Sequence, residues 1–482
     1  MPPSWTPPFE PSAAHQEHSF ARESTISRWP QIITGIIDQM SKINNQEHDD
    51  ARLREGKGLI QQLAQLIYEI KHDKPLPPLP TDTGLPDDIA MYNDEITAYA
   101  AEHEGNPLTW FSATWLYAEC YLCVREAAGP SSAKNSQSKL LSVRYRRIRT
   151  LFAATKHFSS FDPFATQKLD TFRSSMDGIM ALARSMQQLV RKGLPTDTQA
   201  HADWITMVEI CLWGNATDLS LLTSLTHEDI KALQSVERGR EFLLHNDMDI
   251  AWNHVRSSKN RRFDIILDNS GFELFSDLVF ADWLVMSEYA SEVVFHPKNI
   301  PWFVSDVVGA QDFAKTFQVL QDPGFFTESA SSDDQQALSE MVTRWHEHVD
   351  KGRFRLSVPP DFEMGQPGGE IGDFWTSPFS FTELPTRAPA LLEELQKSAL
   401  VIFKGDLNYR KLTSDAWWPT TTTFEEAIGP LRGQFPILSL RTCKADVCVG
   451  LEPGKAEQLD RDEPKWRVNG RYAVVSYCSG SA

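Results

Sequence analysis

The stretch that most constrains the fold of this 482-residue chain is residues 263–274. A run rich in Ile and Leu is typical of a buried strand, and it stops at Asp268, Asn269, Ser270 and Gly271. Apolar residues then recur at helical spacing from Phe272 onward. The pattern predicts a strand, a tight turn and a helix, with Asp268 and Asn269 at the carboxyl end of the strand. Ligands bind at that edge in open α/β sheets, so we take the turn as a candidate site.

From about residue 245 short apolar runs alternate with helical stretches, which predicts an α/β fold with a mainly parallel sheet. A run at residues 301–306 leads into a turn and a helix that continues through Phe317. The proline- and glycine-rich residues 359–389 predict a long irregular loop near the site. Further strands are expected at residues 292–296, 400–403, 437–440, 447–449 and 472–476.

The first part of the chain is predicted to be helical. Apolar stripes at residues 32–40 and 59–70 have helical spacing, and residues 110–127 form a strongly apolar helix candidate. Prolines at residues 74–80 favour a stiff connector over a ligand for a recognition domain. We therefore expect a helical domain at residues 1–200, a connecting segment at 201–244 that contributes to the site, and an α/β/α catalytic domain at 245–482.

Two polar clusters in the helical part allow more than one interpretation. The arginines at positions 144, 146, 147 and 149 could touch phosphate, but a solvated helix face is the commoner meaning. A helix is expected to end at Gly214. The polar residues after it, Asn215, Thr217 and Asp218, either cap that helix or form a polar wall of the site.

The charge balance limits the partners of the chain. Its 47 basic and 65 acidic residues give a net charge of −18, which disfavours nucleic-acid binding but leaves room for a locally basic site. Residues 1–10 lack the features of a secretory signal, and no apolar run is long enough for a membrane span. Cys120 and Cys123 lack a second ligand pair for zinc, so we interpret them as buried thiols. We expect an intracellular, reduced location, the cytoplasm or alternatively the nucleus.

Polar groups follow several of the predicted strands. Asp268, Asn269 and Asp306 supply oxygen ligands, which suit hard divalent cations such as Mg²⁺ or Mn²⁺. An acid at a strand end is often only a helix cap, and Asp306 alone would be interpreted that way. Cations beside a metal are what phosphoryl transfer requires. The other groups of this kind are Asp406, Asn408, Arg410, Arg441 and Lys444.

These residues predict a metal-dependent enzyme that acts on an anionic substrate. Spacing alone leaves open which of the groups meet. The sequence contains no phosphate-cradling Gly-x-x-x-x-Gly-Lys loop, no Gly-x-Ser-x-Gly elbow and no Gly-x-Gly-x-x-Gly dinucleotide turn.

At these positions the chain resembles the metal-dependent damage-control phosphatases, in the branch that acts on sugar phosphates. The same branch has been described as a protein-glutamate carboxyl methyltransferase. The most specific matches are Asp-Leu-Asn-Tyr-Arg-Lys at residues 406–411 and Arg-Thr-x-Lys at residues 441–444. Other matches are residues 115–121, 213–215, 218–221, 267–274 and 300–306, so the resemblance spans nearly the whole chain.

The resemblance implies roles for single residues. Asp268, Asn269 and Asp306 would bind the metal, Mn²⁺ first, with Ni²⁺, Co²⁺ or Mg²⁺ as alternatives. Catalysis would fall to Asp268, Asp306, Arg410 and Lys444. Contacts to a small phosphorylated sugar would come from Asp268, Asn269, Asp306, Asp406, Leu407, Asn408, Tyr409, Arg410, Arg441 and Lys444.

The resemblance also implies a fold, a substrate and an alternative reaction. The fold would be a helical region on a three-layer α/β/α domain, and the substrate would be of the fructose 1-phosphate or fructose 6-phosphate type. For methyl transfer from S-adenosylmethionine, Glu273 would join Asp268 and Asn269 at a cofactor site. A non-enzymatic adaptor built on the helical half is a third possibility, although its apolar stripes are better explained as core.

We expect a monomer. Residues 359–372 are longer than usual for the family, which puts substrate choice at the rim in doubt.

Overall fold

The computed structural model of the chain describes residues 5–79, 88–122, 151–152, 155–158, 164–214, 241–257, 261–299, 304–322, 324–326, 330–362 and 369–480. Some predicted features lie outside these residues. They are the arginines at 144–149, Cys123, the polar residues Asn215, Thr217 and Asp218, and the start of the run at 301–306.

The centre of the molecule is a seven-stranded sheet with the order β1-β7-β6-β5-β2-β3-β4. Neighbouring strands from β6 through β4 are parallel, and β7 is antiparallel to β6. The predicted α/β class with a mainly parallel sheet is therefore confirmed. The strands are β1 (Leu243–Asn246), β2 (Arg261–Ile266), β3 (Ala290–His296), β4 (Phe354–Leu356), β5 (Leu400–Lys404), β6 (Ile437–Thr442) and β7 (Ala473–Cys478).

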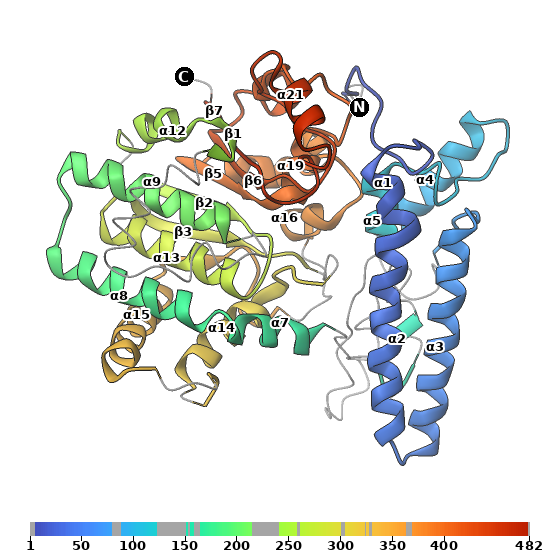
Figure 1. The fold of residues 1–482 in the computed structure, drawn as a ribbon, viewed down its shortest axis with the longest axis horizontal. Helices are drawn as coiled ribbons and strands as arrows, with labels where there is room; N and C mark the ends of the chain where they lie inside the picture. Colours follow the sequence, from blue (N-terminus) through green and yellow to red (C-terminus); the bar gives the residue numbers. More distant parts are fainter. Residues whose placement is uncertain are drawn as a thin grey trace.

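Helices cover both faces of this sheet (Figure 1). On one face α13 (Phe272–Met286) is buried along nearly its whole length, because it lies between the sheet and a further helical layer. That side also contains α7 (Ala165–Arg173), α8 (Met176–Lys192), α9 (Asp197–Trp213), α12 (Met248–Val255), α14 (Gly309–Gln321) and α15 (Ser332–Asp350). The other side contains α16 (Gly369–Asp373), α17 (Leu384–Arg387), α18 (Pro389–Leu395), α19 (Gly405–Leu412), α20 (Phe424–Ala427) and α21 (Lys455–Asp462).

A separate helical unit packs beside the sheet domain, with two long antiparallel helices that project from the body (Figure 1). Its core includes Leu407 and Ala445, which belong to the sheet domain. The unit therefore rests on the segments that carry the predicted site. Its elements are α1 (Phe20–Glu23), a π-helical turn η1 (Ser24–Arg28), α2 (Trp29–Gln46), α3 (Asp50–Lys71), α4 (Asp88–Glu102) and α5 (Trp115–Leu122).

Most predicted elements are present, and two expectations are wrong. Residues 447–449 form no strand, because Arg441 donates hydrogen bonds to the carbonyls of Val447 and Ala445 and holds this segment as a loop. Residues 369–389 are not a long irregular loop but contain short helices, packed through Phe374, Trp375 and Phe381. The helix end at Gly214 is confirmed.

No helix in the described ranges is long and apolar enough to cross a membrane.

The predicted domain division stays a prediction. Within the described residues, α8 and α9 share a hydrophobic core with the sheet and α13. The core of the helical unit is formed instead by segments that precede residue 165 in the sequence, together with Leu407 and Ala445.

Candidate active site

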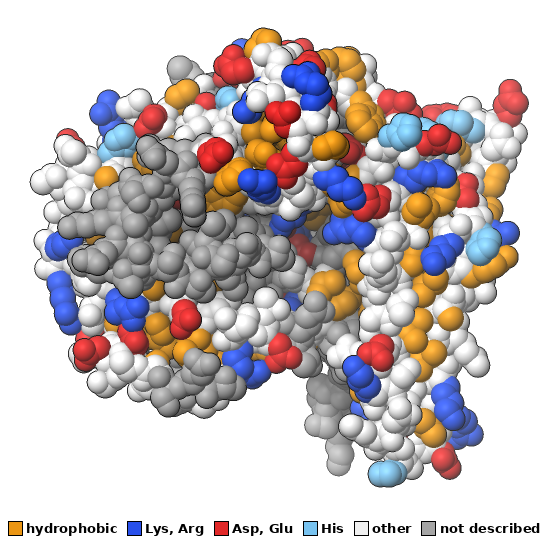
Figure 2. All heavy atoms as spheres, in the orientation of Figure 1, with side chains coloured by type: hydrophobic (Ala, Val, Ile, Leu, Met, Phe, Trp, Pro, Cys, Tyr) orange, Lys and Arg blue, Asp and Glu red, His pale blue; other side chains and the backbone are white. Residues whose placement is uncertain are grey.

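A cavity of about 250 Å³ lies between the helical unit and the carboxyl edge of the sheet. It is smaller than the roughly 300–1,000 Å³ pockets that hold drug-sized ligands, so it suits a small metabolite. On the face shown in Figure 2, acidic and basic side chains are interspersed where the two parts of the molecule meet. The lining residues are Arg28, Trp29, Ile32, Trp115, Glu119, Asp268, Asn269, Val304, Ser305, Asp306, Asp406, Leu407, Arg410 and Lys444.

The three predicted metal ligands meet in this cavity. Asn269 and Asp306 form an isolated antiparallel bridge, and the Val307 N–H donates to the Asp268 carbonyl at 2.8 Å. Ser270 N–H donates to the Ser305 carbonyl at 2.6 Å. These bonds join the turn after β2 to the segment before α14, which is why residues so far apart in the sequence are neighbours here.

A lysine that sequence reasoning missed lies between the two carboxylates. Lys298 Nζ donates to Asp268 Oδ1 at 3.3 Å and also to Asp306 Oδ1. We call Lys298, Asp268 and Asp306 the lysine triad. All three are buried, with exposed fractions of 2%, 7% and 5%. The triad contains two acids and only one ammonium, so the acids outnumber the cation at this point of the cavity.

Burial and neighbouring charge shift the pKa values around this triad. Burial raises the pKa of Asp306 to about 7, against the opposing effect of the Lys298 ammonium. Burial alone would lower the pKa of Lys298, but the carboxylates of Asp306 and Asp268 outweigh it and raise it. Both effects favour a proton or another cation within the triad.

Gly405 sets the distance between strand β5 and Asp268. Its φ is +84°, and a Cβ at this position would lie 1.9 Å from Asp268 Oδ2. Only glycine combines this backbone conformation with such a close approach. The glycine that opens α19 therefore allows Asp268 and Asp406 to line the same cavity.

The residues present fit a hard divalent cation in their donor chemistry. Asp268 and Asp306 offer carboxylate oxygens, which Mg²⁺ and Mn²⁺ prefer, and water or substrate would complete the coordination. Asn269 Nδ2 donates to Asp268 Oδ2 and Glu273 Oε2, each at 2.8 Å, so ligation through Oδ1 requires rotation of its amide. The described residues contain no cluster of three His, Cys, Asp or Glu side chains arranged for a metal. Ligation of a metal by Asn269 stays a prediction.

A second group of buried charged residues lies next to Asn269. Lys404 Nζ donates to Glu273 Oε1 at 3.2 Å, to Asp277 Oδ1 at 2.7 Å and to the Cys211 carbonyl at 2.9 Å. Burial raises the pKa of Glu273 to about 7, partly offset by Lys404. Glu273 accepts from Asn269 and from Lys404, so it connects the turn after β2 to the end of β5.

The Arg-Thr-x-Lys segment positions Asp406. Arg441 Nε donates to Asp406 Oδ1 at 2.8 Å, and the Lys444 backbone N–H donates to the same oxygen at 3.0 Å. Arg441 itself is fully buried over the Tyr409 ring and does not line the cavity. Lys444 and Asp406 do line it, so this segment brings one cation and one acid to the site.

Arg410 lines the cavity with its guanidinium already paired. Its Nη1 donates to Glu119 Oε2 at 2.7 Å, and its Nη2 donates to Asp415 Oδ2 at 2.9 Å. We call Arg410, Glu119 and Asp415 the arginine triad. The guanidinium carbon lies 3.5 Å from the centre of the Trp115 ring. Since Trp115 and Glu119 belong to α5, this triad joins the helical unit to α19.

Two other predicted substrate contacts have structural bonds and do not line the cavity. Asn408 Nδ2 donates to the Lys404 carbonyl at 2.8 Å and to the Leu267 carbonyl at 3.3 Å, which joins the ends of β2 and β5. The Tyr409 hydroxyl accepts from the Val449 N–H at 3.0 Å. Leu407 lines the cavity and also belongs to the core of the helical unit. Contacts of Asn408, Tyr409, Arg410 or Arg441 with substrate stay predictions.

Sequence reasoning missed Lys298, Glu119 and Arg28. Lys298 follows strand β3 by two residues, so the rule that selected Asp268 could have found it. Glu119 is the acid within the apolar α5 sequence, which is the mark of a buried, paired charge. Arg28 carries no such signal, because it precedes an ordinary amphipathic helix.

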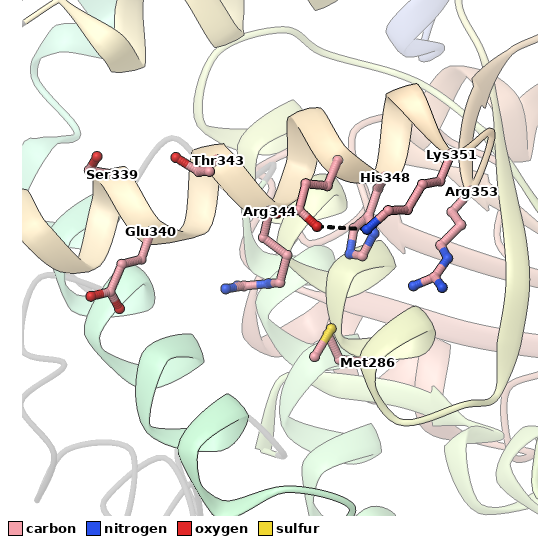
Figure 3. Close-up of a pocket in the computed structure, with 9 residues that line it drawn as sticks. Met286, Ser339, Glu340, Thr343, Arg344, His348, Lys351 and Arg353 are labelled. Carbon is pink, nitrogen blue, oxygen red and sulfur yellow. Dashed lines mark hydrogen bonds and ion pairs between the residues drawn. The ribbon is translucent and has the colours of Figure 1, made fainter.

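A second hollow, of about 420 Å³, lies at the opposite edge of the sheet, where α15 leads into β4 (Figure 3). Its polar groups are largely paired with each other or with the core. Arg344 and His348 both donate to the buried Asp282, and Lys351 is paired with Glu347 at 2.8 Å. The predicted site residues are absent from its lining. The smaller cavity is therefore the candidate active site.

Acids and cations at the carboxyl edge of a parallel sheet define an enzyme site for an anionic substrate, and comparison with known proteins gives the class. The damage-control phosphatase ARMT1-like domain matches residues 25–459. Damage-control phosphatase ARMT1 of Xenopus laevis is 35% identical over 483 residues, covering 97% of this chain and 98% of that protein. The human protein of that name is 32% identical over 474 residues, covering 95% and 96%.

The chain therefore belongs to the damage-control phosphatase ARMT1-like family, as its resemblance predicted. That membership identifies it as a phosphatase of the damage-control class. A solved DUF89 family protein from Pyrococcus horikoshii is 15% identical, with a TM-score of 0.33 and coverage of 69% of this chain and 79% of that one. A similarity this low carries no argument about the site.

Proposed function

We propose that the chain is a metal-dependent phosphatase that hydrolyses small sugar phosphates of the fructose 1-phosphate and fructose 6-phosphate type. The observation that carries the proposal is that the carboxylates of Asp268 and Asp306 line the same small cavity as Lys444. Acids that can hold a cation and a lysine that can neutralise phosphate are what phosphoryl transfer needs. Mn²⁺ is the proposed ion, with Ni²⁺, Co²⁺ or Mg²⁺ as alternatives.

The proposed roles follow from the contacts. Asp268, Asp306 and the rotated amide of Asn269 hold the cation, which would supply charge for the phosphoryl oxygens and lower the pKa of water. Lys444, which follows β6, neutralises the phosphate from the sheet side of the cavity. Asp406 is held by Arg441 and the Lys444 N–H, and its carboxylate accepts from a sugar hydroxyl or orients the attacking water. Lys298 keeps Asp268 and Asp306 apart and aligned.

Methyl transfer from S-adenosylmethionine to protein carboxylates is the alternative function. It would place the cofactor near Asp268, Asn269 and Glu273. The geometry favours it less, because Glu273 is buried and bonded to Lys404, with an exposed fraction of 2%. The cavity of about 250 Å³ is also small for a nucleoside cofactor together with a protein side chain.

One assay tests the proposal. Metal-stripped protein is given fructose 1-phosphate with and without Mn²⁺, beside the variant Asp268→Ala. We expect phosphate release only with Mn²⁺, and a rate at least ~10²–10³-fold lower in the variant, as when one preorganised charge contact is removed. Phosphate release by stripped protein, or by Asp268→Ala at the wild-type rate, would contradict the proposal. Lys444→Ala should lower turnover without lowering the unfolding temperature.

The remaining expectations belong to the same proposal. We propose a monomer that acts in the cytoplasm or nucleus and binds neither nucleic acid nor membrane. The net charge of −18 supports the exclusion of nucleic acid. Gel filtration with light scattering and fluorescence localisation of the full chain would test the oligomeric state and location.

A further inference from the structure

We propose that Arg28, on the helical unit, binds the phosphate group of the substrate from the wall opposite the sheet. This inference rests on the proposed phosphatase function and adds a substrate-binding residue that neither the sequence motifs nor the family resemblance assigned. It implies that the helical unit takes part in substrate recognition. The sheet domain would then supply only one side of the phosphate site.

The helical unit forms a substantial part of the cavity wall. Arg28, Trp29 and Ile32 line it from η1 and α2, and Trp115 and Glu119 line it from α5. Ile32 and Trp29 are apolar, and Glu119 is paired with Arg410. Arg28 is therefore the residue of this wall that can offer positive charge to a ligand.

The backbone around Arg28 is unusual. Residues Ser24–Arg28 form a π-helical turn between α1 and α2, and Arg28 is its last residue. π-helical turns are rare and occur frequently at functional sites, because they rotate the residues that follow relative to a continuous α-helix. Here the turn ends where Arg28 and Trp29 reach the cavity.

The other basic residues around the site are occupied by acids. Both terminal nitrogens of Arg410 are paired, with Glu119 and Asp415. Lys298 is held between Asp268 and Asp306. Arg441 is bonded to Asp406 and buried away from the cavity. Arg28 and Lys444 also line the cavity.

Arg28 is held in place without a carboxylate partner among the described residues. Its Nη1 donates a long bond of 3.4 Å to Ser24 Oγ, and its guanidinium carbon lies 4.8 Å from the centre of the Phe20 ring. The ring contact orients the planar group and leaves most of its N–H donors for a ligand. Arg28 and Glu119 line the same cavity, so the charge of Arg28 lies near the cavity acids.

Charge balance explains why a phosphatase would need this arginine. The cavity is lined by the acids Asp268, Asp306, Asp406 and Glu119. These acids offset much of the positive charge that Lys298, Arg410, Lys444 and a bound divalent ion supply, so a further cation in the lining strengthens the attraction for a phosphate dianion. A guanidinium can bind two phosphate oxygens at once, whereas Lys444 acts as a point charge. Arg28 therefore complements Lys444 across the cavity.

The test compares Arg28→Ala and Arg28→Gln with a matched control, Arg54→Ala. Arg54 is an exposed arginine on α3 outside the cavity, so its replacement removes the same charge at a distance. With fructose 1-phosphate and Mn²⁺, we expect KM to rise about 10-fold or more in both Arg28 variants, with kcat changed less, as for loss of a charged hydrogen bond. The control should keep the wild-type KM.

Inorganic phosphate gives a second readout that needs no turnover. It should raise the unfolding temperature of Mn²⁺-loaded wild type and Arg54→Ala more than that of the Arg28 variants. If wild type hydrolyses the sugar phosphate but both Arg28 variants keep its KM and phosphate response, the role of Arg28 is overturned and the proposed function stands. If wild type shows no hydrolysis, the proposed function fails, and the phosphate shift alone decides whether Arg28 binds the anion.

Arg28→Gln also guards against a folding defect, because it keeps an unbranched side chain with a polar end. An Arg28→Gln protein with wild-type unfolding temperature and a raised KM supports the proposal. An Arg28→Gln protein with wild-type unfolding temperature and wild-type KM contradicts the proposal, whatever the behaviour of Arg28→Ala.

Discussion

The lysine triad and the arginine triad have the same composition, two carboxylates and one cation, but both acids of the first line the cavity, whereas only Glu119 of the second does. In the arginine triad the two ends of one planar fork bond to Glu119 and Asp415, and Trp115 covers the guanidinium face. In the lysine triad a single ammonium bonds to Asp268 and Asp306 at one oxygen each. The guanidinium is a planar fork with a fixed geometry, whereas the ammonium is a point charge between two acids that both line the cavity, so a divalent ion can replace it more readily.

Two clusters with the same set of charges can therefore have different roles. The arginine triad is a structural joint between the helical unit and α19. The lysine triad is the proposed ligand site, in which the buried cation prevents repulsion between the acids but does not replace a divalent ion. Replacement of the cation in each triad should lower the free energy of unfolding by different amounts and should respond differently to Mn²⁺.

The largest effect on stability is expected from Arg410→Met. It leaves Glu119 and Asp415 buried without a cation, and breaking a buried pair in this way typically costs about 3–5 kcal/mol. Chemical denaturation should therefore show a large loss of unfolding free energy. Because Asp415 does not line the cavity, an ion there is not expected to bridge both acids, and Mn²⁺ should not restore the lost stability. Recovery of stability on Mn²⁺ addition would show that the arginine triad is also a cation site.

Lys298→Met should give a smaller loss, about 2–3 kcal/mol in metal-free protein, because its carboxylates face the cavity. Here Mn²⁺ should restore most of the unfolding free energy, since the ion takes the place of the ammonium between Asp268 and Asp306. The measurement is denaturation with and without Mn²⁺. Equal loss in both conditions would contradict the assignment of Asp268 and Asp306 as metal ligands.

A third cluster of two acids and one cation consists of Lys404, Glu273 and Asp277. It should make the stability of the protein depend on pH. The folded-state pKa of Glu273 is raised to about 7, above the unfolded value of 4.5. The free energy of unfolding therefore falls as pH rises from about 4.5 to about 7, and this penalty is complete above pH 7 and absent below about pH 4.5. Glu273→Gln should be more stable than wild type by about 1–2 kcal/mol at pH 8, and the gain should shrink below pH 6. A gain that does not vary with pH would mean that Glu273 is not the titrating group.

Much of the fold could be predicted because its signals are local. The apolar runs of β2, β5 and β6 and the turn at Asp268 depend on neighbouring residues alone. The loop at 447–449 depends on bonds from Arg441, and apolar composition could not distinguish it from a strand. The short helices after residue 368 depend in the same way on aromatic packing in the core.

In the candidate site, too, residues with a local sequence signal could be predicted, and those that depend on distant contacts could not. The sequence selected Asp268, Asn269, Asp306, Asp406 and Lys444, which follow strands and therefore meet at one edge of the sheet. It could not show that Arg410 is paired, because Glu119 lies in a different unit nearly 300 positions earlier. Arg28 could not be found for the same reason, since its position depends on how the helical unit rests on the sheet domain.

The most direct test of the account is anomalous X-ray diffraction from crystals of Mn²⁺-loaded protein, measured at the manganese absorption edge. The account predicts one strong peak within about 2.0–2.6 Å of carboxylate oxygens from both Asp268 and Asp306, with the Asn269 amide oxygen turned toward it. A peak elsewhere, with Lys298 alone between the two carboxylates, would contradict the proposed metal site.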